Sequence, residues 1–293
     1  MKLTCCFIDI DKEYKANTEI GLKRLIDTYS AVGFDGIDFN VGMPEYCSGT
    51  YGADFYKNIK CYADDKGICF DQTHVPYPTV FPDESKNTFR FEQMVTCIEH
   101  SALLGARFVV IHPCCQMDYV KGNNREYIMD YNYKFFKKLA PHAENCGVKL
   151  AIENVGNYRG HAVTETAEGL IELLDMLDSD VFVACYDSGH SNCLTDDPIG
   201  MLTKLGDRIA CTHIHDNDCT VDQHLLPYYG KLDFEKTMEA LANTGYNGNL
   251  NYEARNFATR VPMELRVEAL KYMVGVGHYL IDRFNYYRGK QNG

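Results

Sequence analysis

The sequence predicts an α/β protein in which residues 1–293 form a single (β/α)8 TIM barrel. Eight short strand-like segments alternate with helical segments along the whole chain, an alternation typical of parallel α/β sheets. Most strand segments are continuous apolar runs, as parallel strands covered on both faces require. The chain contains no linker, low-complexity tract or charge block, and its length suits one such barrel. An open doubly wound sheet is the alternative, but neither GxGxxG nor GxxxxGKS/T occurs.

The expected strands are recognised by their apolar and β-branched content. In chain order they are Leu3–Ile8, Gly36–Phe39, Ile68–His74, Phe108–His112, Lys149–Glu153, Val181–Asp187, Ile209–His215 and Asn249–Glu253. The carboxyl ends of barrel strands meet at one mouth, where catalytic residues lie. The longer segments Ser188–Pro198 and Asp216–Lys231 are therefore expected to be active-site loops.

The helical segments between these strands have recognisable ends. The expected N-terminal residues are Thr18, Asn87 or Thr88, Thr164 before the run AEGLIELLDML, and Asp233, and the expected terminating glycines are Gly33, Gly105 and Gly245. Pro198 and Pro262 suit first-turn positions. Pro141 is expected to kink or divide the long helix Arg125–Cys146.

The composition is acidic, with 41 Asp and Glu against 29 Lys and Arg and a formal net charge of −12 at pH 7. Lys and Arg dominate binding to nucleic acids and anionic membranes, so this balance argues against both as partners. No segment has 18 consecutive apolar residues, and Asp9 and Asp11 interrupt the first apolar run too early for a signal peptide. We therefore expect a cytoplasmic protein without a membrane segment. Its 13 cysteines, an odd number without any CxxC, are expected to be reduced.

Acidic residues and histidines gather where the predicted strands end. His74, His112, Glu153, Asp187, His213, His215 and Glu253 lie at strand ends, and His190 and His224 lie just beyond. Each alone has an ordinary structural explanation, such as a buried hydrogen-bonded histidine or a helix-capping aspartate. Their gathering at one mouth indicates a functional site. The remaining histidines, on helices or surface loops, are expected to be structural: His100, His142, His161 and His278.

Buried acids at the barrel mouth predict a metal. Because side chains alternate faces along a strand, Glu153, Asp187 and His213 extend the inward faces of their strands. A buried carboxylate without a partner costs several kcal/mol, so acids gathered at one mouth need cations. A divalent ion on Glu153, Asp187, His213 and Glu253 meets that need, although His215 faces the same way as His213. Mn²⁺ is favoured where carboxylates dominate, and Zn²⁺, Co²⁺ or Mg²⁺ also suit such ligands.

The order of these motifs resembles the sugar phosphate isomerase/epimerase family, part of the xylose-isomerase-like TIM barrel superfamily that also contains endonuclease IV. The segments THVPY, VVIHP, LAIENVG, YDSGH, THIHDND and DQHLLPYYGKLDF follow the family order across nearly the whole chain. By this resemblance the metal ligands are Glu153, Asp187, His213 and Glu253. His213 is preferred over His215 because THIHD then matches the family strand and Asp216 supplies its acid.

The resemblance implies that a metal polarises a sugar carbonyl while a neighbouring proton is abstracted, giving an enediolate. Glu153 and Glu253 would exchange protons from opposite sides of the sugar, which gives epimerisation or aldose–ketose isomerisation. His190 would contact a substrate oxygen. A related lyase or dehydratase reaction on a keto-sugar or keto-inositol is an alternative.

The sequence departs from characterised ketose 3-epimerases at their substrate contacts. Arg159 stands where those enzymes carry a second Glu, and residues 216–218 lack the Arg that follows their seventh-strand His. Arg159 and Arg255 could form an anion site for a phosphate or carboxylate, or be solvated loop charges. The expected partner is a small carbohydrate. The 21 tyrosines, without tryptophan, are compatible with sugar stacking or with a homo-oligomer interface.

Two other classes of function stay open. Endonuclease IV binds three zinc ions through nine ligands, and a candidate for each occurs here: His74, His112, Glu153, Asp187, His190, His213, Asp222, His224 and Glu253. Asp222 and His224 are the pair that a one-metal epimerase does not need, whereas the net charge argues against a DNA substrate. A partner-dependent barrel subunit is the third possibility, because a barrel does not fix function.

Overall fold

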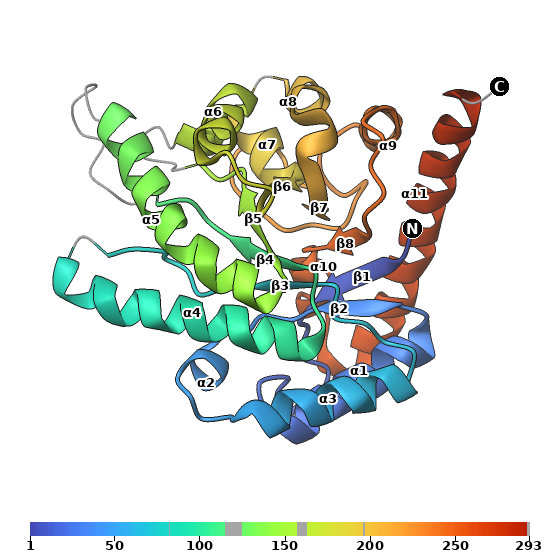
Figure 1. Cartoon of the computed structure of the whole chain (residues 1–293). Coiled ribbons are helices and arrows are strands. Elements are labelled where there is room, and N and C mark those ends of the chain that lie inside the picture. The colour runs from blue at the N-terminus through green and yellow to red at the C-terminus, as the bar shows by residue number, and fades with distance from the viewer. Residues whose placement is uncertain (82, 115–124, 157–162, 196, 292–293) are drawn as a thin grey trace.

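The computed structural model describes residues 1–81, 83–114, 125–156, 163–195 and 197–291. In these residues eight short strands lie at the centre and helices surround them (Figure 1). The strands are β1 (Leu3–Cys6), β2 (Gly36–Asp38), β3 (Gln72–His74), β4 (Phe108–Ile111), β5 (Lys149–Glu153), β6 (Phe182–Asp187), β7 (Ile209–His213) and β8 (Leu250–Tyr252). Every expected strand is present, most of them shorter than expected, and the predicted TIM barrel is confirmed.

The strands pair in parallel in two sheets, β2–β1–β8 and β3–β4–β5–β6–β7. At the two seams between the sheets, isolated bridges replace continuous ladders. Phe39 bridges to Thr73 at one seam, and Ile214 bridges to Tyr252 at the other. Backbone hydrogen bonds nevertheless cross both seams, from Phe39 N–H to the Gln72 carbonyl at one and from Ile214 N–H to the Asn251 carbonyl at the other, and they close the barrel.

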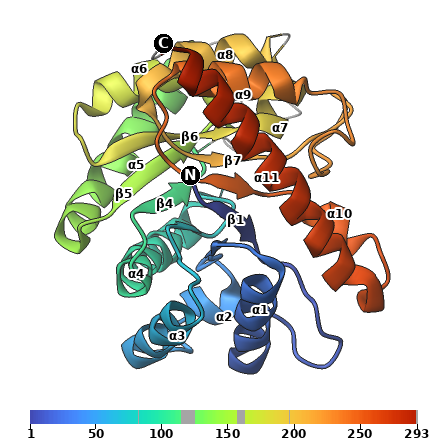
Figure 2. The ribbon, with the colours of Figure 1, turned by 90° about the vertical axis from the view of Figure 1, so that its right-hand side faces the viewer.

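Helices follow the strands in the order expected for this fold. They are α1 (Glu19–Val32), α2 (Pro44–Cys47), α3 (Ala53–Asp65), α4 (Asn87–Leu104), α5 (Arg125–Cys146), α6 (Ala167–Leu177), α7 (Ser188–Leu194), α8 (Pro198–Leu205), α9 (Phe234–Asn243), α10 (Arg255–Thr259) and α11 (Arg266–Gln291). The long C-terminal helix α11 runs along one side of the barrel and packs against α1 and α9 (Figure 2).

Several helix ends agree with the sequence prediction. The side chain of Thr18 accepts a hydrogen bond from the first turn of α1, and that of Asp233 does the same for α9. Gly33 takes the left-handed conformation that ends α1, with φ of 104°. Pro198 lies in the first turn of α8, where its missing N–H costs nothing.

Two expected N-caps are wrong, because their side chains serve the preceding loops. Asn87 begins α4, but its side chain accepts a hydrogen bond from the backbone N–H of Phe81. Thr164 donates its hydroxyl to the carbonyl of Val155 and so holds the chain that follows β5. Thr166, two residues later, caps α6 instead.

Pro262 and one loop differ from expectation, whereas the kink expected at Pro141 stays a prediction. Pro141 lies inside α5 without dividing it. Pro262 precedes the short 3-10 turn Met263–Leu265, so it does not occupy the first turn of α11. The segment after β6 begins with the short helix α7, whereas residues 216–231 form a loop as expected.

Apolar side chains line the strands below the site residues. A small buried cluster consists of Phe108, Val110, Ala151, Cys185 and Cys211. Glu153, Asp187 and His213 each lie two residues beyond a member of this cluster, on the same face of the same strand. On three neighbouring strands, the inward-facing side chains thus change from apolar to ionisable between one inward-facing residue and the next.

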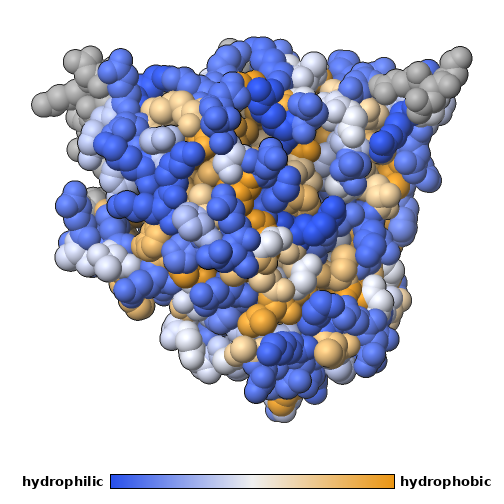
Figure 3. Space-filling view, in the orientation of Figure 1, coloured by the Kyte–Doolittle hydropathy of each residue, from blue (hydrophilic) through white to orange (hydrophobic). Residues whose placement is uncertain are grey.

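The face shown in Figure 3 is covered mostly by hydrophilic side chains, with smaller apolar patches among them. Among the described residues, no helix is long and apolar enough to cross a membrane. The buried residues Cys5, Cys47, Cys97, Cys185 and Cys211 have free thiols, as expected.

Candidate metal and substrate site

Four acidic and histidine side chains meet at the carboxyl mouth of the barrel. Glu153, Asp187 and His213 end β5, β6 and β7, and Glu253 directly follows β8. One donor atom from each lies within 4.8 Å of the donors of the other three. Parallel pairing places Asp187 directly beside His213. The structure therefore brings together the four residues proposed from the sequence as metal ligands.

His213 and His215 both face inward and both approach Asp187, but their shortest contacts are with different acids. Nδ1 of His213 lies 3.2 Å from Glu153 Oε1 and 3.4 Å from Glu253 Oε2. Nε2 of His215 lies 3.0 Å from the carboxylate of Asp187. His213 stands in the four-residue group, whereas His215 stands in another possible donor group with His224 and Glu253. The choice of His213 as the ligand therefore stays a prediction.

A second group of donors adjoins the first and shares Glu153 with it. His74 and His112 approach each other with 3.2 Å between their Nε2 atoms. Glu153 Oε2 lies 3.1 Å from the nitrogen of His112 and 3.5 Å from that of His74. Nδ1 of His74 lies 2.7 Å from the carbonyl oxygen of Val75. A hydrogen bond donated there leaves Nε2 with a free lone pair, the arrangement that metal-bound histidines usually have.

His190, Asp222 and His224 form a third group on the other side of Asp187. Asp222 Oδ2 lies 2.7 Å from His224 Nε2 and 3.5 Å from His190 Nε2. Nδ1 of His224 lies 2.9 Å from the carbonyl oxygen of Glu253, and Nδ1 of His190 lies 3.1 Å from that of Asn154. His224 has a positive φ of 48°, which is uncommon for a residue with a side chain. All six residues proposed as additional metal or substrate contacts therefore lie at this mouth.

The charges at the site strongly shift one another's pKa values. Burial raises the pKa of Glu153, but His213 and His112 hold it well below its usual range. Burial lowers the pKa of His213, but Glu153 and Glu253 raise it well above its ordinary value. Burial likewise opposes the charge on His224, yet its hydrogen bond to Asp222 raises its pKa to about 9. The site thus favours charged carboxylates facing cationic partners.

The donor set fits a divalent cation. Several buried polar atoms have no hydrogen-bond partner among the described residues, and they include Glu153 Oε2, His215 Nδ1 and Asp222 Oδ1. Buried acceptors without partners are costly, and a cation bound between carboxylate and imidazole atoms would satisfy them. The mixed oxygen and nitrogen donors suit Mn²⁺, Zn²⁺ or Co²⁺.

A cavity of about 770 Å³ opens above these donors. Its lining includes His74, His112, His190, Asp222, His224 and Glu253 from the donor groups. Arg255, at the start of α10, also lines it and is exposed. Arg159 and His161 lie outside the described residues. The cavity therefore places one of the two arginines proposed as an anion site within reach of a ligand.

Two glycines let the backbone pack tightly around the site. A Cβ atom on Gly189 would lie 1.9 Å from the His215 ring, so only glycine fits between Asp187 and His190. A Cβ atom on Gly230 would lie 2.2 Å from the carbonyl oxygen of Asn217. These close approaches explain the glycines of the YDSGH and LPYYG segments.

Asp216, the acid of the HxxD spacing, organises the loop after β7. Its carboxylate accepts hydrogen bonds from the backbone N–H groups of Asn217, Gly230 and Leu232. Burial raises its pKa, although these hydrogen bonds oppose the rise. Its contacts are therefore those of a residue that shapes the loop that carries Asp222.

Two polar residues near the donors were missed from the sequence. Asn154 accepts a hydrogen bond from the N–H of Asp187 and donates one to the Asp187 carbonyl, which ties the ends of β5 and β6 together. Asp38, at the end of β2, lies 3.0 Å from His213 Nε2. We expected this strand to end at Phe39, but it ends one residue earlier, at Asp38. Asp38 was therefore not recognised as an acidic residue at a strand end.

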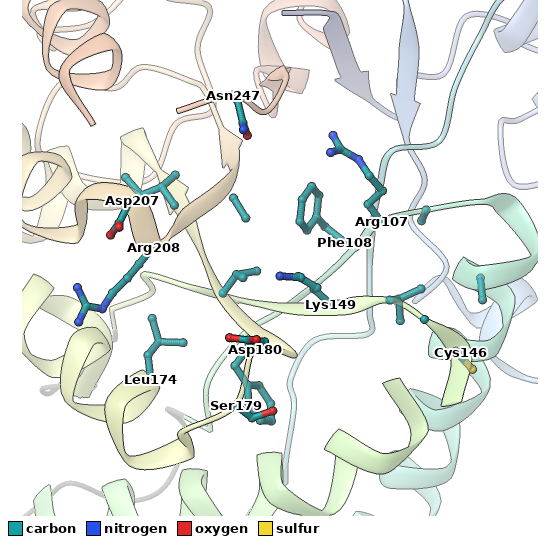
Figure 4. A pocket seen from close by; sticks show the side chains of 18 of the residues that line it. Arg107, Phe108, Cys146, Lys149, Leu174, Ser179, Asp180, Asp207, Arg208 and Asn247 are labelled. Carbon is teal, nitrogen blue, oxygen red and sulfur yellow. The ribbon is translucent and has the colours of Figure 1, made fainter. Parts of the chain in front are cut away.

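The opposite mouth holds a cavity of a different kind. It measures about 1120 Å³ and is lined by the first residues of β4 to β7, such as Phe108 and Lys149, and by Arg107 just before β4 (Figure 4). Arg107 pairs with Asp71 there, and Arg208 with Asp175. These arginine side chains are 56% and 41% exposed, so the pairs are ordinary surface ion pairs.

The fold and the site together define a TIM barrel with buried acidic and histidine donors at its carboxyl mouth. The chain belongs to the xylose isomerase-like TIM barrel family, whose model matches residues 26–273. This match confirms the superfamily that the order of motifs indicated.

Three relatives illustrate the range of proteins that the chain resembles. It is 33% identical over 161 residues to the uncharacterised protein y4fM of Sinorhizobium fredii, a match that covers 53% of this chain and 50% of that protein. It is 24% identical to fructoselysine 3-epimerase of Shigella flexneri, over 75% of this chain and 80% of that enzyme. It is 27% identical to inosose dehydratase of Lacticaseibacillus casei, over 47% of this chain and 51% of that enzyme.

Solved structures agree on the fold. A D-tagatose 3-epimerase-like protein aligns with a TM-score of 0.73 at 23% identity, over 96% of this chain and all of that one. The IOLI protein, whose structure holds a zinc atom, aligns with a TM-score of 0.73 at 20% identity, over 98% of this chain and 99% of that one. At these identities the likeness establishes the fold alone.

Proposed function

We propose that this chain is a divalent-metal-dependent sugar or sugar-phosphate isomerase or epimerase that abstracts a proton next to a carbonyl. One observation carries the proposal. Glu153, Asp187, His213 and Glu253 place four donor atoms within 4.8 Å of one another at the mouth where TIM-barrel enzymes react. The sugar epimerases among the relatives support the same class of reaction.

The four residues would hold one divalent ion, with Mn²⁺ favoured over Zn²⁺, Co²⁺ or Mg²⁺ because three of the four ligands are carboxylates. Such an ion supplies Lewis-acid polarisation of the substrate carbonyl. A carboxylate of the site would remove the hydrogen next to that carbonyl, which would give an enediolate.

The two proposed catalytic carboxylates differ in their access to substrate. Glu253 lines the cavity and its side chain is 20% exposed, whereas Glu153 is fully buried. The pKa of Glu153 also lies well below its usual range because His213 and His112 face it, so Glu153 is a weak base. We therefore assign to Glu253 the proton transfer at the open side. Glu153, at the floor of the cavity, would transfer the proton on the opposite face of the substrate.

Substrate contacts would come from two further residues. His190 lines the cavity three residues after Asp187 and would bind a substrate oxygen. Arg255 lines the cavity and would bind a phosphate or carboxylate group. Arg159, outside the described residues, stays in this proposal on the sequence alone. The substrate is accordingly proposed to be a small carbohydrate. An acidic or phosphorylated one fits the position of Arg255.

A dehydratase reaction on a keto-inositol is an alternative within this chemistry, and the inosose dehydratase relative supports it. Proton abstraction next to a carbonyl begins both reactions. The two alternatives therefore differ in what leaves the substrate afterwards and not in the residues that begin the reaction.

A multi-zinc phosphodiesterase is the candidate from another class. The two extra donor groups, around His112 and around Asp222, are the observation that favours it. The net charge of −12 opposes a nucleic-acid substrate. A barrel subunit that needs a partner would contain these buried acids at a cost in stability without using them.

The proposal is tested by proton exchange with solvent. Purified protein with Mn²⁺ is incubated in D₂O with ketoses, ketose phosphates and keto-inositols, and deuterium uptake beside the carbonyl is measured by mass spectrometry. We expect uptake with at least one of these substrates and a loss of about 10²–10⁴-fold in Glu253→Gln. Hydrolysis of a phosphodiester without any deuterium uptake would contradict the proposal and favour the phosphodiesterase.

A further inference from the structure

Asp38, at the end of β2, contacts the site without standing in any of the three donor groups. It is 3% exposed, and within the described residues its side chain forms hydrogen bonds through Oδ2 but not through Oδ1. This oxygen lies 3.0 Å from His213 Nε2, 2.9 Å from Gln72 Nε2 and 3.0 Å from Asn251 Nδ2. Nitrogen donors from three different strands therefore converge on one carboxylate oxygen.

These strands meet where the two sheets close the barrel. Gln72 lies on β3 and His213 on β7, whereas Asp38 and Asn251 lie on β2 and β8 in the smaller sheet. Thr4, on β1, donates its hydroxyl to Asn251 Oδ1 at 2.7 Å, which turns the amide nitrogen of Asn251 toward Asp38. Side-chain hydrogen bonds thus link five strands across both seams, in addition to the backbone hydrogen bonds that cross them. Asp38 is held firmly in place.

The contact with Asp38 decides which nitrogen of His213 faces the acids. A neutral imidazole carries one N–H and one free lone pair. In the neutral form, which is the one that would bind a metal, the N–H on Nε2 is donated to Asp38 and the lone pair belongs to Nδ1, which lies 3.2 Å from Glu153 Oε1 and 3.4 Å from Glu253 Oε2. A charged acceptor on the far nitrogen also makes the imidazole a stronger ligand.

We propose that Asp38 is a positioning residue that fixes the ring and tautomer of His213, so that Nδ1 is presented to a divalent metal held by Glu153, Asp187 and Glu253. This inference rests on the metal site of the proposed function and adds to it a residue from the opposite sheet. Gln72 and Asn251 donate two further hydrogen bonds to Asp38 Oδ2 and so prevent the carboxylate from turning away from His213.

Asp38→Asn is the most informative variant, because it keeps the shape of the side chain. Its amide oxygen can take the place of Oδ2 and still accept from His213, Gln72 and Asn251. Its NH₂ group would then lie where Asp38 Oδ1, within the described chain, has no hydrogen-bond partner. The variant therefore removes the negative charge behind His213 while it preserves the hydrogen bonds that close the barrel.

The experiment measures the dissociation constant for Zn²⁺ by competition with a chromophoric chelator. Asp38→Asn should weaken Zn²⁺ binding by about 10–100-fold. In a His213→Gln background, the same substitution should have no further effect, because the group through which Asp38 acts is gone. Asp71→Asn, at the opposite mouth, is the matched control and should bind Zn²⁺ like the wild type. Thermal unfolding of the metal-free proteins checks that each variant is folded.

The possible outcomes separate this inference from the proposed function. Unchanged Zn²⁺ affinity in Asp38→Asn would overturn the positioning role, and so would an equal loss in the His213→Gln background. Failure of the wild type to bind Zn²⁺ would overturn the metal site itself and the proposed function with it. Nitrogen-15 NMR of the Zn²⁺-loaded wild type gives a second readout, in which His213 should carry its proton on Nε2.

Discussion

The two mouths of the barrel each hold a cavity, of about 770 Å³ at the carboxyl ends of the strands and about 1120 Å³ at the amino ends. Arginines at the amino mouth are partly exposed and form surface ion pairs, as Arg107 does with Asp71. Glu153, Asp187 and His213 at the carboxyl mouth are almost completely buried. The two mouths therefore differ in the burial of charge, and the proposed site lies at the mouth with the smaller cavity.

The difference has an energetic meaning. Exposed ion pairs contribute about 0–1 kcal/mol each, so the amino mouth can carry many charges at little cost. Buried acids cost several kcal/mol unless they are paired, so a cluster of them is retained where it has a use. The carboxyl mouth should thus respond strongly to single substitutions and to pH, and the amino mouth should not.

The largest expected effect comes from matched aspartates at the two mouths. Asp187→Asn keeps the cap on α7, because Asn also accepts a hydrogen bond from the N–H of His190. It nevertheless removes one charge from the four-donor group. We expect solvent proton exchange to fall by about 10²–10⁴-fold. Asp180→Asn, in the lining of the amino mouth, should leave exchange unchanged. Equal effects of the two substitutions would refute the distinction between the mouths.

A smaller effect is expected on the pH dependence of stability. The pKa of His224 is raised to about 9, from an unfolded value of about 6.5, by its hydrogen bond to Asp222. The protonated histidine therefore stabilises the metal-free fold fully below about pH 6.5, and this contribution is lost as the pH rises through about 9. A shift of this size corresponds to on the order of 3 kcal/mol.

Thermal unfolding of chelator-treated protein between pH 6 and pH 10 measures this effect. The wild type should lose stability as the pH rises, and His224→Gln should lose less. His278→Gln, an exposed position on α11, is the control and should follow the wild type. A wild-type protein that grows more stable over this range would show that the histidines of the site are not held protonated.

The smallest effect concerns the backbone of the loop after β7. A Cβ atom at Gly230 would lie 2.2 Å from the carbonyl oxygen of Asn217 and 2.4 Å from Asp216 Oδ1. Gly230→Ala should therefore destabilise the fold by about 1–3 kcal/mol. Gly275→Ala, in open space on α11, should instead stabilise it by up to about 1 kcal/mol. Chemical denaturation measures both, and equal changes would show that the close packing around Gly230 is not required.

The sequence predicted the strands and the gathering of donors well, for a physical reason. A buried strand that ends in Glu153, Asp187 or His213 changes abruptly from apolar to ionisable, and parallel strands bring such ends together. The same reasoning placed His74, His112 and His190 near the site, as the structure does. Their roles as ligands and substrate contacts stay predictions, as does the single domain over residues 1–293.

The sequence did not reveal the residues that support the donors. Asp38 and Asn251 lie within short polar strands, where no apolar run marks the inward face. Their partners are distant in the chain, and only the closure of the barrel brings them to His213. The helix cap at Thr166 was missed for a local reason. Thr164 has the same chemistry, and the sequence does not show that its hydroxyl bonds to Val155.

The central claim is that the carboxyl mouth binds one divalent metal through Glu153, Asp187, His213 and Glu253. Elemental mass spectrometry of protein purified without chelators or affinity metals tests it most directly. We predict about one Mn, Co, Mg or Zn per chain in the wild type, and a loss of that metal in Asp187→Asn. Two to three zinc ions per chain would contradict the one-metal account and move hydrolysis ahead of isomerisation. A wild type without any bound metal would contradict the metal site altogether.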